Sequence, residues 1–176
     1  MGSDIMHSHL ELKNAQGEWH RLYDYVCPIR DDYDQACPEK HWPFWWRSYD
    51  IYAVIGGVRN YSQVKTIKHH CGLPEDSEYL HEVVSDPDGW SLHQKVLRKD
   101  SYPFDQAWAY RWFTIAAMLE FDYDTTLVDA RDNNTTKTYR EFLGANYFKV
   151  LDSLVELVNK EAGGNATRIR LIICFD

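Results

Sequence analysis

The first 26 residues constrain the fold more than any other part of the sequence. Polar and apolar residues alternate over 5–13, turn-forming residues occupy 14–17, and the alternation resumes over 18–26. Two alternating runs joined by a short turn that contains Asn and Gly are typical of a β-hairpin. We therefore expect two antiparallel strands in this part of the chain.

The register of this hairpin decides which side chains share a face. With a turn centred on Ala15 and Gln16, Glu11 lies opposite His20. One face then carries the polar set His7, His9, Glu11, His20 and Asp24. The other face, expected to be the core side, carries Met6, Leu10, Leu12, Trp19, Tyr23 and Tyr25.

The remaining periodic segments predict helices and one further strand. Helices are expected over 49–58, 75–85, 115–119, and from the capping box Thr138–Glu141 to the glycines at 163 and 164. The apolar stripe of the last helix is Leu143, Tyr147, Val150, Leu151, Leu154 and Val158. The run 168–175 is β-branched and apolar on both faces, as in a buried central strand. The fold class is therefore α+β: a small, mainly antiparallel sheet, made of the N-terminal hairpin and the C-terminal strand, covered by three or four helices.

The length of 176 residues predicts a single domain, 1–176, because a chain of this size buries one hydrophobic core. Its most irregular part is a long loop over 27–47, which carries three prolines and ends in the aromatic run 42–46. A loop of this length in a compact domain is usually functional or packed by its own side chains.

Charge and hydropathy exclude several classes of partner. Nineteen Lys and Arg against 27 Asp and Glu give a net charge of −8, without a concentrated basic face, so DNA is not an expected partner. No apolar run approaches the ~18 residues of a membrane span, and no secretory signal precedes the hairpin. Four cysteines without a signal peptide are typical of reduced thiols in a cytosol.

The motif His7-x-His9-x-Glu11 is the sharpest candidate for metal chemistry. Side chains two residues apart on a strand point to the same side, so these three could ligate one divalent ion, helped by His20 or Asp24 across the hairpin. Such an ion could activate water in a hydrolase or phosphodiesterase. A solvated polar face of the hairpin is the other interpretation, and the sequence leaves both open.

Aromatic residues make up 15% of the chain, and several tryptophans fall in loops or at element starts rather than at helical core spacing. Arginines occur nearby, and aromatic faces with guanidinium groups are typical of sites that bind flat rings and phosphates. Tryptophan as core filler is the alternative interpretation. The candidate ligand contacts are Trp45, Trp46, Arg47, Arg59, Trp108 and Tyr110.

Several short segments, spread in order over most of the chain, share their residues and spacing with a known family. They are Gly2-Ser3-Asp4-Ile5, His7-x-His9-Leu10-Glu11-Leu12-Lys13, Gly17-x-Trp19-His20, Arg47-x-Tyr49-Asp50-x-Tyr52-Ala53-x-Ile55-x-Gly57-Val58-Arg59-Asn60, Gly72-Leu73-Pro74-x-Asp76, Trp112-Phe113-Thr114-Ile115, and the strand ending Phe175-Asp176. In these segments the chain resembles a widespread, functionally unassigned family of bacteriophage proteins.

The chain departs from the pattern of that family at two places. The family strand reads Asp-Ile-His-x-His-x-Glu; here Met6 is inserted, which breaks the alternation between Asp4 and His7 or requires a β-bulge. The family tends to carry a second His-x-His pair where this chain has Trp108 and Tyr110. If the relatives hold a metal between the two pairs, half of the ligands are missing here, which favours binding over catalysis.

The resemblance and the aromatic surplus together predict a phage-type binding protein that acts in the host cytoplasm. Its expected partner is a small nucleotide-type ligand, sequestered to antagonise host defence, or a host protein. Such a protein needs no cofactor and is not an enzyme. The alternative is a metal-dependent hydrolase that uses the strand face of His7, His9 and Glu11, with a divalent metal as cofactor. Self-association is left open by the sequence.

Overall fold

The computed structural model describes residues 5–30, 38–78 and 109–175 of the protein. At its centre is a five-stranded sheet in the order β2–β1–β7–β4–β3, in which every neighbouring pair is antiparallel. Its strands are β1 (Ile5–Lys13), β2 (Trp19–Leu22), β3 (His70–Cys71), β4 (Ala109–Thr114) and β7 (Ile169–Phe175). The expected α+β class with a small antiparallel sheet is confirmed, and β3 and β4 join the hairpin and the C-terminal strand in it.

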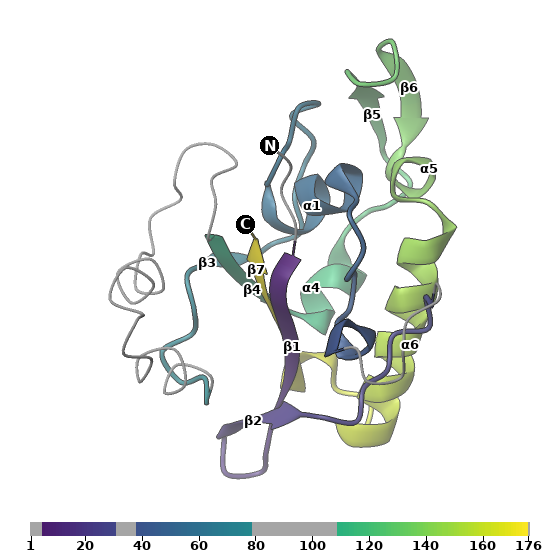
Figure 1. Ribbon diagram of the computed structural model, residues 1–176. Coiled ribbons are helices and arrows are strands. Elements are labelled where there is room, and N and C mark those ends of the chain that lie inside the picture. Colours follow the sequence, from purple (N-terminus) through teal and green to yellow (C-terminus); the bar gives the residue numbers. More distant parts are fainter. Residues whose placement is uncertain (1–4, 31–37, 79–108, 176) are drawn as a thin grey trace.

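The helices gather on one side of this sheet, as Figure 1 shows. They are α1 (Tyr49–Gly56), α4 (Ile115–Glu120), α5 (Tyr139–Leu143) and α6 (Ala145–Glu161), with 3-10 turns η1 (Pro38–His41) and η2 (Ala166–Arg168). A separate two-stranded sheet, β5 (Thr126–Asp129) and β6 (Thr135–Thr138), stands away from the central sheet beyond α5. None of the helices in the described ranges is long and apolar enough to cross a membrane.

The β1–β2 hairpin forms as expected, but its register differs from the expected one by one residue. Glu11 lies opposite Arg21, and His20 lies opposite Leu12. The expected pairing of Glu11 with His20 is therefore wrong. Because neighbouring strand residues point to opposite faces, the shift moves His20 off the face of Glu11 and brings Trp19 and Arg21 onto it.

The cause of this shift is the turn. The backbone N–H of Asn14 donates to the carbonyl of Glu18 at 2.8 Å, so the loop has three residues rather than two. Its third residue, Gly17, has φ +83°, the left-handed conformation that closes three-residue hairpin loops. One extra loop residue shifts every pairing that follows it.

The inserted residue Met6 coincides with a register break, as the sequence predicted. Ile5 pairs with Phe175 and His7 with Cys174, so the residue of β1 between these two pairs has no paired residue on β7. A bulge of this kind restores the alternation downstream. His7 and His9 therefore both occupy register positions on the face that also carries Glu11.

Three of the expected helix starts are confirmed by capping hydrogen bonds. The hydroxyls of Ser48, Thr114 and Thr138 accept from backbone N–H groups at the starts of α1, α4 and α5. Helix α1 ends two residues earlier than expected, where Gly57 adopts φ +68°. The expected last helix is split into α5 and α6 at Gly144, which has φ +81°.

The expected apolar stripe of α6 is buried, from Tyr147 to Val158. The expected helix over 75–85 is not seen where it can be checked, because residues 75–78 form turns; residues 79–85 lie outside the described ranges.

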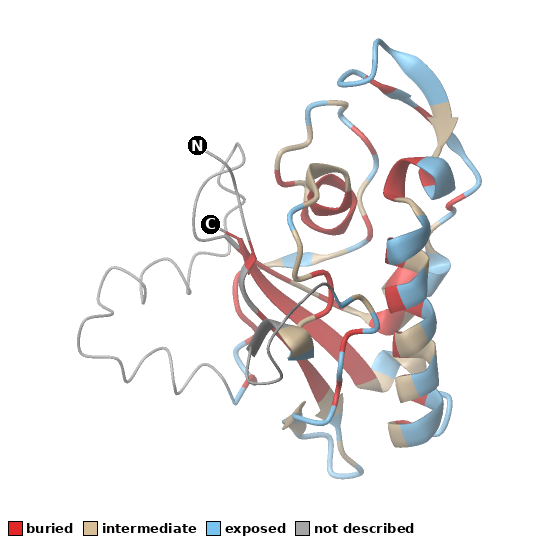
Figure 2. Cartoon of the chain, turned by 45° about the vertical axis from the view of Figure 1, so that its right-hand side comes forward, coloured by how far each residue is buried: buried red, intermediate tan, exposed pale blue. Residues whose placement is uncertain are grey.

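The central strand β7 is buried along its whole length, as the sequence predicted and Figure 2 shows. Its two faces have different surroundings. Ile169, Leu171 and Ile173 belong to the main hydrophobic core beneath the helices. Arg170 alternates with them on the other face and is only 2% exposed. The sheet therefore has an apolar face and, behind it, a buried face that contains charge.

Candidate functional site

The charged face of the sheet holds a buried ion-pair network. The side chain of Arg170 on β7 lies opposite Glu11 on β1 and donates from Nε to Oε1 at 2.9 Å. His9, two residues before Glu11, places its Nε2 3.3 Å from Oε2 of the same carboxylate. The three side chains are between 0% and 2% exposed. Charges buried to this degree need partners, and these residues supply them for one another.

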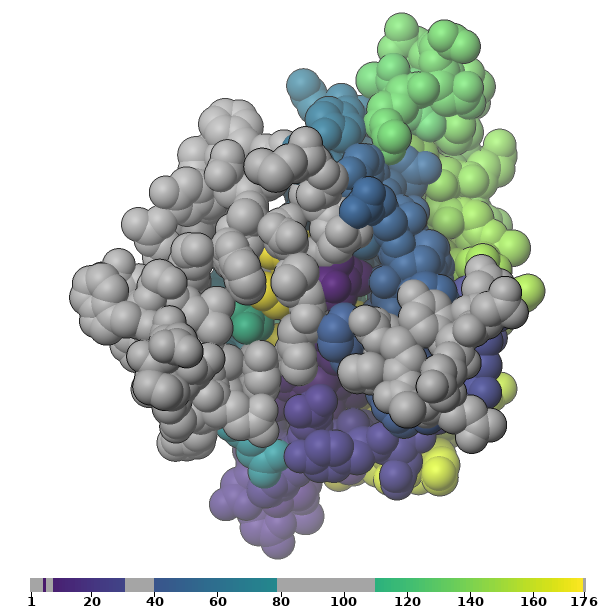
Figure 3. All heavy atoms as spheres, in the orientation of Figure 1, coloured from purple at the N-terminus to yellow at the C-terminus, as the bar shows by residue number. Residues whose placement is uncertain are grey.

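A segment that crosses this face completes the network. We call residues 73–78 the strap; Figure 1 shows it (teal) descending from β3 toward β2. Its Ser77 hydroxyl donates to Oε2 of Glu11 at 2.7 Å, and Oδ1 of Asp76 lies 2.9 Å from Nη2 of Arg170. Glu78 accepts from the backbone N–H of Arg21 at 3.0 Å. Figure 3 shows teal atoms of this part of the chain against the purple atoms of the hairpin.

Electrostatics keep the carboxyl of Glu11 ionised. Burial alone would raise the pKa of the Glu11 carboxyl, but hydrogen bonds from His9 and Ser77 and the charge of Arg170 outweigh burial and lower this pKa. Nη2 of Arg170 lies 2.8 Å from Oε1 of Glu11, although its N–H bonds are not directed at an acceptor. The pairing therefore depends on Nε and on charge.

Two tryptophans enclose the guanidinium of Arg170. Its Cζ lies 4.0 Å from the centre of the Trp19 ring and 5.2 Å from that of Trp112. The imidazole of His70 is stacked on Trp112, with ring centres 4.1 Å apart and planes 17° from parallel. Register explains the grouping, because His70 pairs with Trp112 across β3 and β4. Cation–π contact stabilises a buried guanidinium that has few water contacts.

These rings form one wall of a cavity of about 480 Å³, which we call the indole cleft. The strap forms another wall, and two of its carboxylates line the cavity. The lining residues are Trp19, His70, Cys71, Leu73, Pro74, Glu75, Asp76, Trp112 and Arg170. Stacking faces, a fixed guanidinium and carboxylate acceptors thus converge on one space.

The expected metal ligands are only partly brought together. His9 and Glu11 are in contact, but both Glu11 oxygens already accept hydrogen bonds from protein donors. His20 lies elsewhere, at the outer edge of β2, with Nδ1 2.6 Å from a carboxylate oxygen of Glu78. This contact and one with Glu18 raise the pKa of His20.

The side chain of His7 lies outside the described part of the structure. Asp24 is exposed after the end of β2. Within the described ranges, no group of three or more His, Cys, Asp or Glu side chains is arranged to hold a metal ion.

The expected ligand-contact residues are distributed over separate places. Trp45 and Trp46 lie edge to face, 5.9 Å apart, and pack against the core before α1. Trp45 donates its indole N–H to the carbonyl of Ile29. Arg47 beside them is exposed, whereas Tyr110 is buried on β4.

Arg59, another of these expected contacts, adopts φ +53° after α1 and places Nη1 3.4 Å from the Tyr61 hydroxyl. Trp108 lies outside the described residues. The five expected contact residues that the structure describes do not line the indole cleft.

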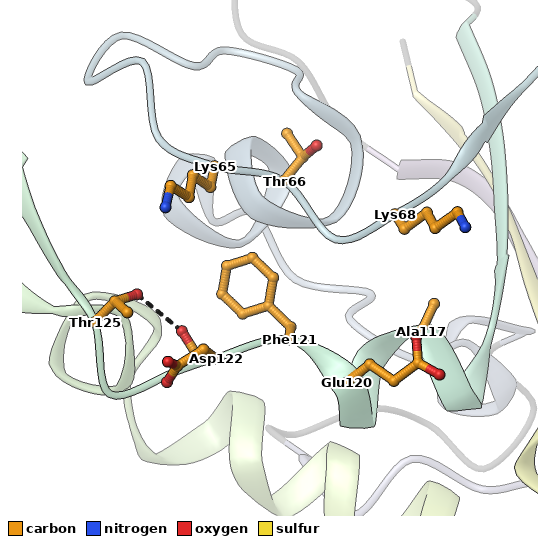
Figure 4. A pocket seen from close by; sticks show the side chains of 8 residues that line it. All are labelled: Lys65, Thr66, Lys68, Ala117, Glu120, Phe121, Asp122 and Thr125. Atoms are coloured by element: carbon orange, nitrogen blue, oxygen red, sulfur yellow. Dashed lines mark hydrogen bonds between the residues drawn. The ribbon is translucent and has the colours of Figure 1, made fainter.

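Figure 4 shows a second cavity, of about 420 Å³, beside the end of α4. Lys65 and Lys68 stand across from Glu120 and Asp122, with the ring of Phe121 between them. The charges balance, and none of the polar side chains that line this cavity is buried. The indole cleft is therefore the better candidate for specific recognition.

Comparison with protein-family models, with curated proteins and with solved structures found no match to this chain. We therefore infer its function from the chemistry of the site.

Sequence reasoning missed the residues that build the cleft, although one signal pointed to them. Arg170 stands in a run that is otherwise apolar on both faces, Ile169–Phe175. A charge inside a buried strand requires a partner from another element. Glu11 is an acidic residue in the alternating N-terminal strand, so it was a candidate for that partner. For the strap, by contrast, no local pattern in the sequence indicates that it crosses the charged face of the sheet.

Proposed function

We propose that this protein binds a small nucleotide-type ligand, with the base of the ligand in the indole cleft. The observation that carries the proposal is the convergence of Trp19, Trp112 and Arg170 with strap carboxylates around one cavity. Ligand sites are typically cavities of ~300–1,000 Å³ with aromatic walls and a few fixed polar groups. The cleft, at about 480 Å³, falls within this range.

The polar lining of the cleft favours a base over a phosphate. Arg170 is already paired with Glu11 and Asp76, so it offers little uncompensated positive charge. Glu75 adds a further carboxylate to the lining. Carboxylates accept hydrogen bonds from the exocyclic amino groups of bases and repel phosphate groups. We therefore expect phosphates to project out of the cleft.

The biological setting is part of the same proposal. The phage-family resemblance of the motifs around His7–Lys13 and Arg47–Asn60 supports a phage-type protein that acts in the host cytoplasm. A phage protein that sequesters a signalling nucleotide would antagonise a host defence that depends on that signal. A ligand held by stacking and hydrogen bonds, without chemical conversion, suits this role.

Calorimetric titration of the full chain with adenosine, guanosine, AMP, ATP and a cyclic dinucleotide tests the binding. Saturable binding of at least one compound is expected, with a nucleoside bound no more weakly than its triphosphate. Trp112→Leu should weaken binding about 5- to 150-fold, the amount expected for one lost stacking contact. Trp45→Leu makes the same chemical change outside the cleft and should leave affinity unchanged.

Two results would overturn the proposal. One is no saturable binding of any of these compounds at millimolar concentration. The other is loss of binding in Trp45→Leu but not in Trp112→Leu, which would assign recognition to the loop before α1.

A test in cells follows from the proposed role. Expression of the protein should weaken a nucleotide-signalled defence against a phage that this defence normally blocks. Expression of the Trp112→Leu variant should leave the defence intact.

A further inference from the structure

We propose that a second, smaller cavity at the open edge of β1 binds a small oxyanion. This cavity, which we call the His9 pocket, has a volume of about 180 Å³, and the described residues that line it differ from those of the indole cleft. It is lined by Ser8, His9, Arg21, Leu22, Tyr23, His41 and Trp42.

The pocket exists because the hairpin pairing stops early. The last pair joins Leu10 to Leu22, so Ser8 and His9 lie beyond the paired part of β2. No strand of the described ranges closes this edge; His41 and Trp42, from the end of η1 onward, border the space. The volume is about that of six liquid waters, enough for a phosphate or a small carboxylate but too small for a nucleotide.

The charge of the lining favours an anion. Arg21 supplies a guanidinium, which lies over the Tyr23 ring with Cζ 5.1 Å from the ring centre. His9 and His41 each contribute an imidazole, and none of the described residues that line the pocket carries a carboxylate. Glu11 lies behind His9 and is engaged with Arg170. The indole cleft, lined by Glu75 and Asp76, has the opposite preference.

The histidine at the end of η1, His41, is fixed in a defined tautomer. Nδ1 of His41 lies 2.8 Å from the carbonyl oxygen of Tyr25, which only accepts, so Nδ1 carries a proton.

An unpaired hydroxyl supplies the second, independent observation. Ser8 is fully buried, and its Oγ has no hydrogen-bond partner among the residues that the structure describes. A buried hydroxyl without a partner costs free energy, which an acceptor in the adjoining pocket would recover. Ser8 and Arg21 come from two strands and border the same cavity. An oxyanion accepts from both kinds of donor, which a neutral apolar ligand does not.

Titration of the full chain with inorganic phosphate and, separately, with acetate tests this assignment. The readouts are the imidazole NMR signals of His9 and His41, with sodium chloride at matched ionic strength as the control. We expect saturable shifts of both signals with phosphate, acetate or both, and none with chloride. Binding of one probe alone identifies the oxyanion as phosphate or carboxylate. Absence of saturation by about 10 mM for both probes would overturn the proposal.

Two variants complete the test. Arg21→Gln should weaken anion affinity about tenfold or more, because a charge-assisted hydrogen bond is lost. Ser8→Ala should raise the melting temperature in anion-free buffer and reduce the further rise that phosphate produces. The matched control is Ser153→Ala, whose hydroxyl is bonded to the carbonyl of Val150 and should therefore lower the melting temperature. Unchanged affinity in Arg21→Gln, or a lower melting temperature in Ser8→Ala, contradicts the assignment.

Discussion

Replacing Glu11 by Gln tests whether the charge of this residue stabilises the folded protein through the buried network. The change keeps the size of the side chain and one acceptor oxygen but removes the charge opposite Arg170, both residues being at most 2% exposed. Breaking a buried ion pair by removing one partner costs about 3–5 kcal/mol. Asp76 remains 2.9 Å from Nη2, but it is 64% exposed and compensates little. We expect Glu11→Gln to lose about 3–5 kcal/mol of unfolding free energy.

Urea denaturation followed by circular dichroism measures this loss, and the melting temperature should fall by roughly 6–20 °C. The double variant Glu11→Gln with Arg170→Met separates the pair from other effects. Because the second change removes the orphaned charge, the two losses of unfolding free energy should not add. The double variant should lose about 0.5–3 kcal/mol less than the sum of the two single losses. A loss under about 1 kcal/mol in Glu11→Gln, or strict additivity, would refute the reasoning.

The same residue makes stability depend on pH with a defined sign. The folded pKa of Glu11 is lowered from its ordinary value of 4.5. The stabilisation is therefore fully present above that value and is lost as pH falls below it toward the folded pKa. Between roughly pH 5 and pH 3, the natural protein should lose more stability than Glu11→Gln does. Equal slopes for the two proteins would contradict this assignment.

Three further substitutions have expected outcomes in urea denaturation. Gly56→Ala should destabilise by about 1–3 kcal/mol, because a Cβ there would lie 2.9 Å from the buried Phe175 ring; unchanged stability would contradict the close packing. Tyr123 donates its hydroxyl proton to a backbone carbonyl at 2.7 Å, so Tyr147 must donate to Tyr123. Tyr123→Phe should therefore cost about 1–3 kcal/mol and Tyr147→Phe only about 0.5–1.5, and the reverse order would disprove this direction. Thr138→Ala should cost about 0.5–2 kcal/mol through the lost cap, whereas Thr138→Ser should cost less.

Local signals in the sequence predicted the parts of the fold that local interactions determine. The caps at Ser48, Thr114 and Thr138 and the buried stripe of α6 follow from short-range patterns. The split of the last helix at Gly144 was missed, because a glycine within a strong periodic pattern is compatible with an unbroken helix. The hairpin was recognised, but Gly17 in the left-handed region moved its register by one residue.

The candidate site was beyond prediction mainly because its contacts are distant in sequence. Ser77 and Glu11 are 66 residues apart, and Arg170 and Glu11 are 159 apart. The expected face of the hairpin placed Trp19 in the core and His20 beside Glu11, which the register reverses. Once the register is known, the alternation of the strands brings Trp19 and Arg170 to one face.

The place of β7 in the sheet has a consequence for biosynthesis. Arg170 follows Glu11 by 159 residues, so at about 5–20 residues per second the ribosome makes the central strand roughly 8–30 s after β1. Throughout that interval one edge of β1 lacks its native partner, a state that invites pairing with other nascent chains. Polar residues of β1, His9 and Glu11 among them, keep this strand from forming a continuous apolar segment, and such residues disfavour pairing of this kind. Residues that are costly to bury in the finished protein thus protect the chain while it is being made.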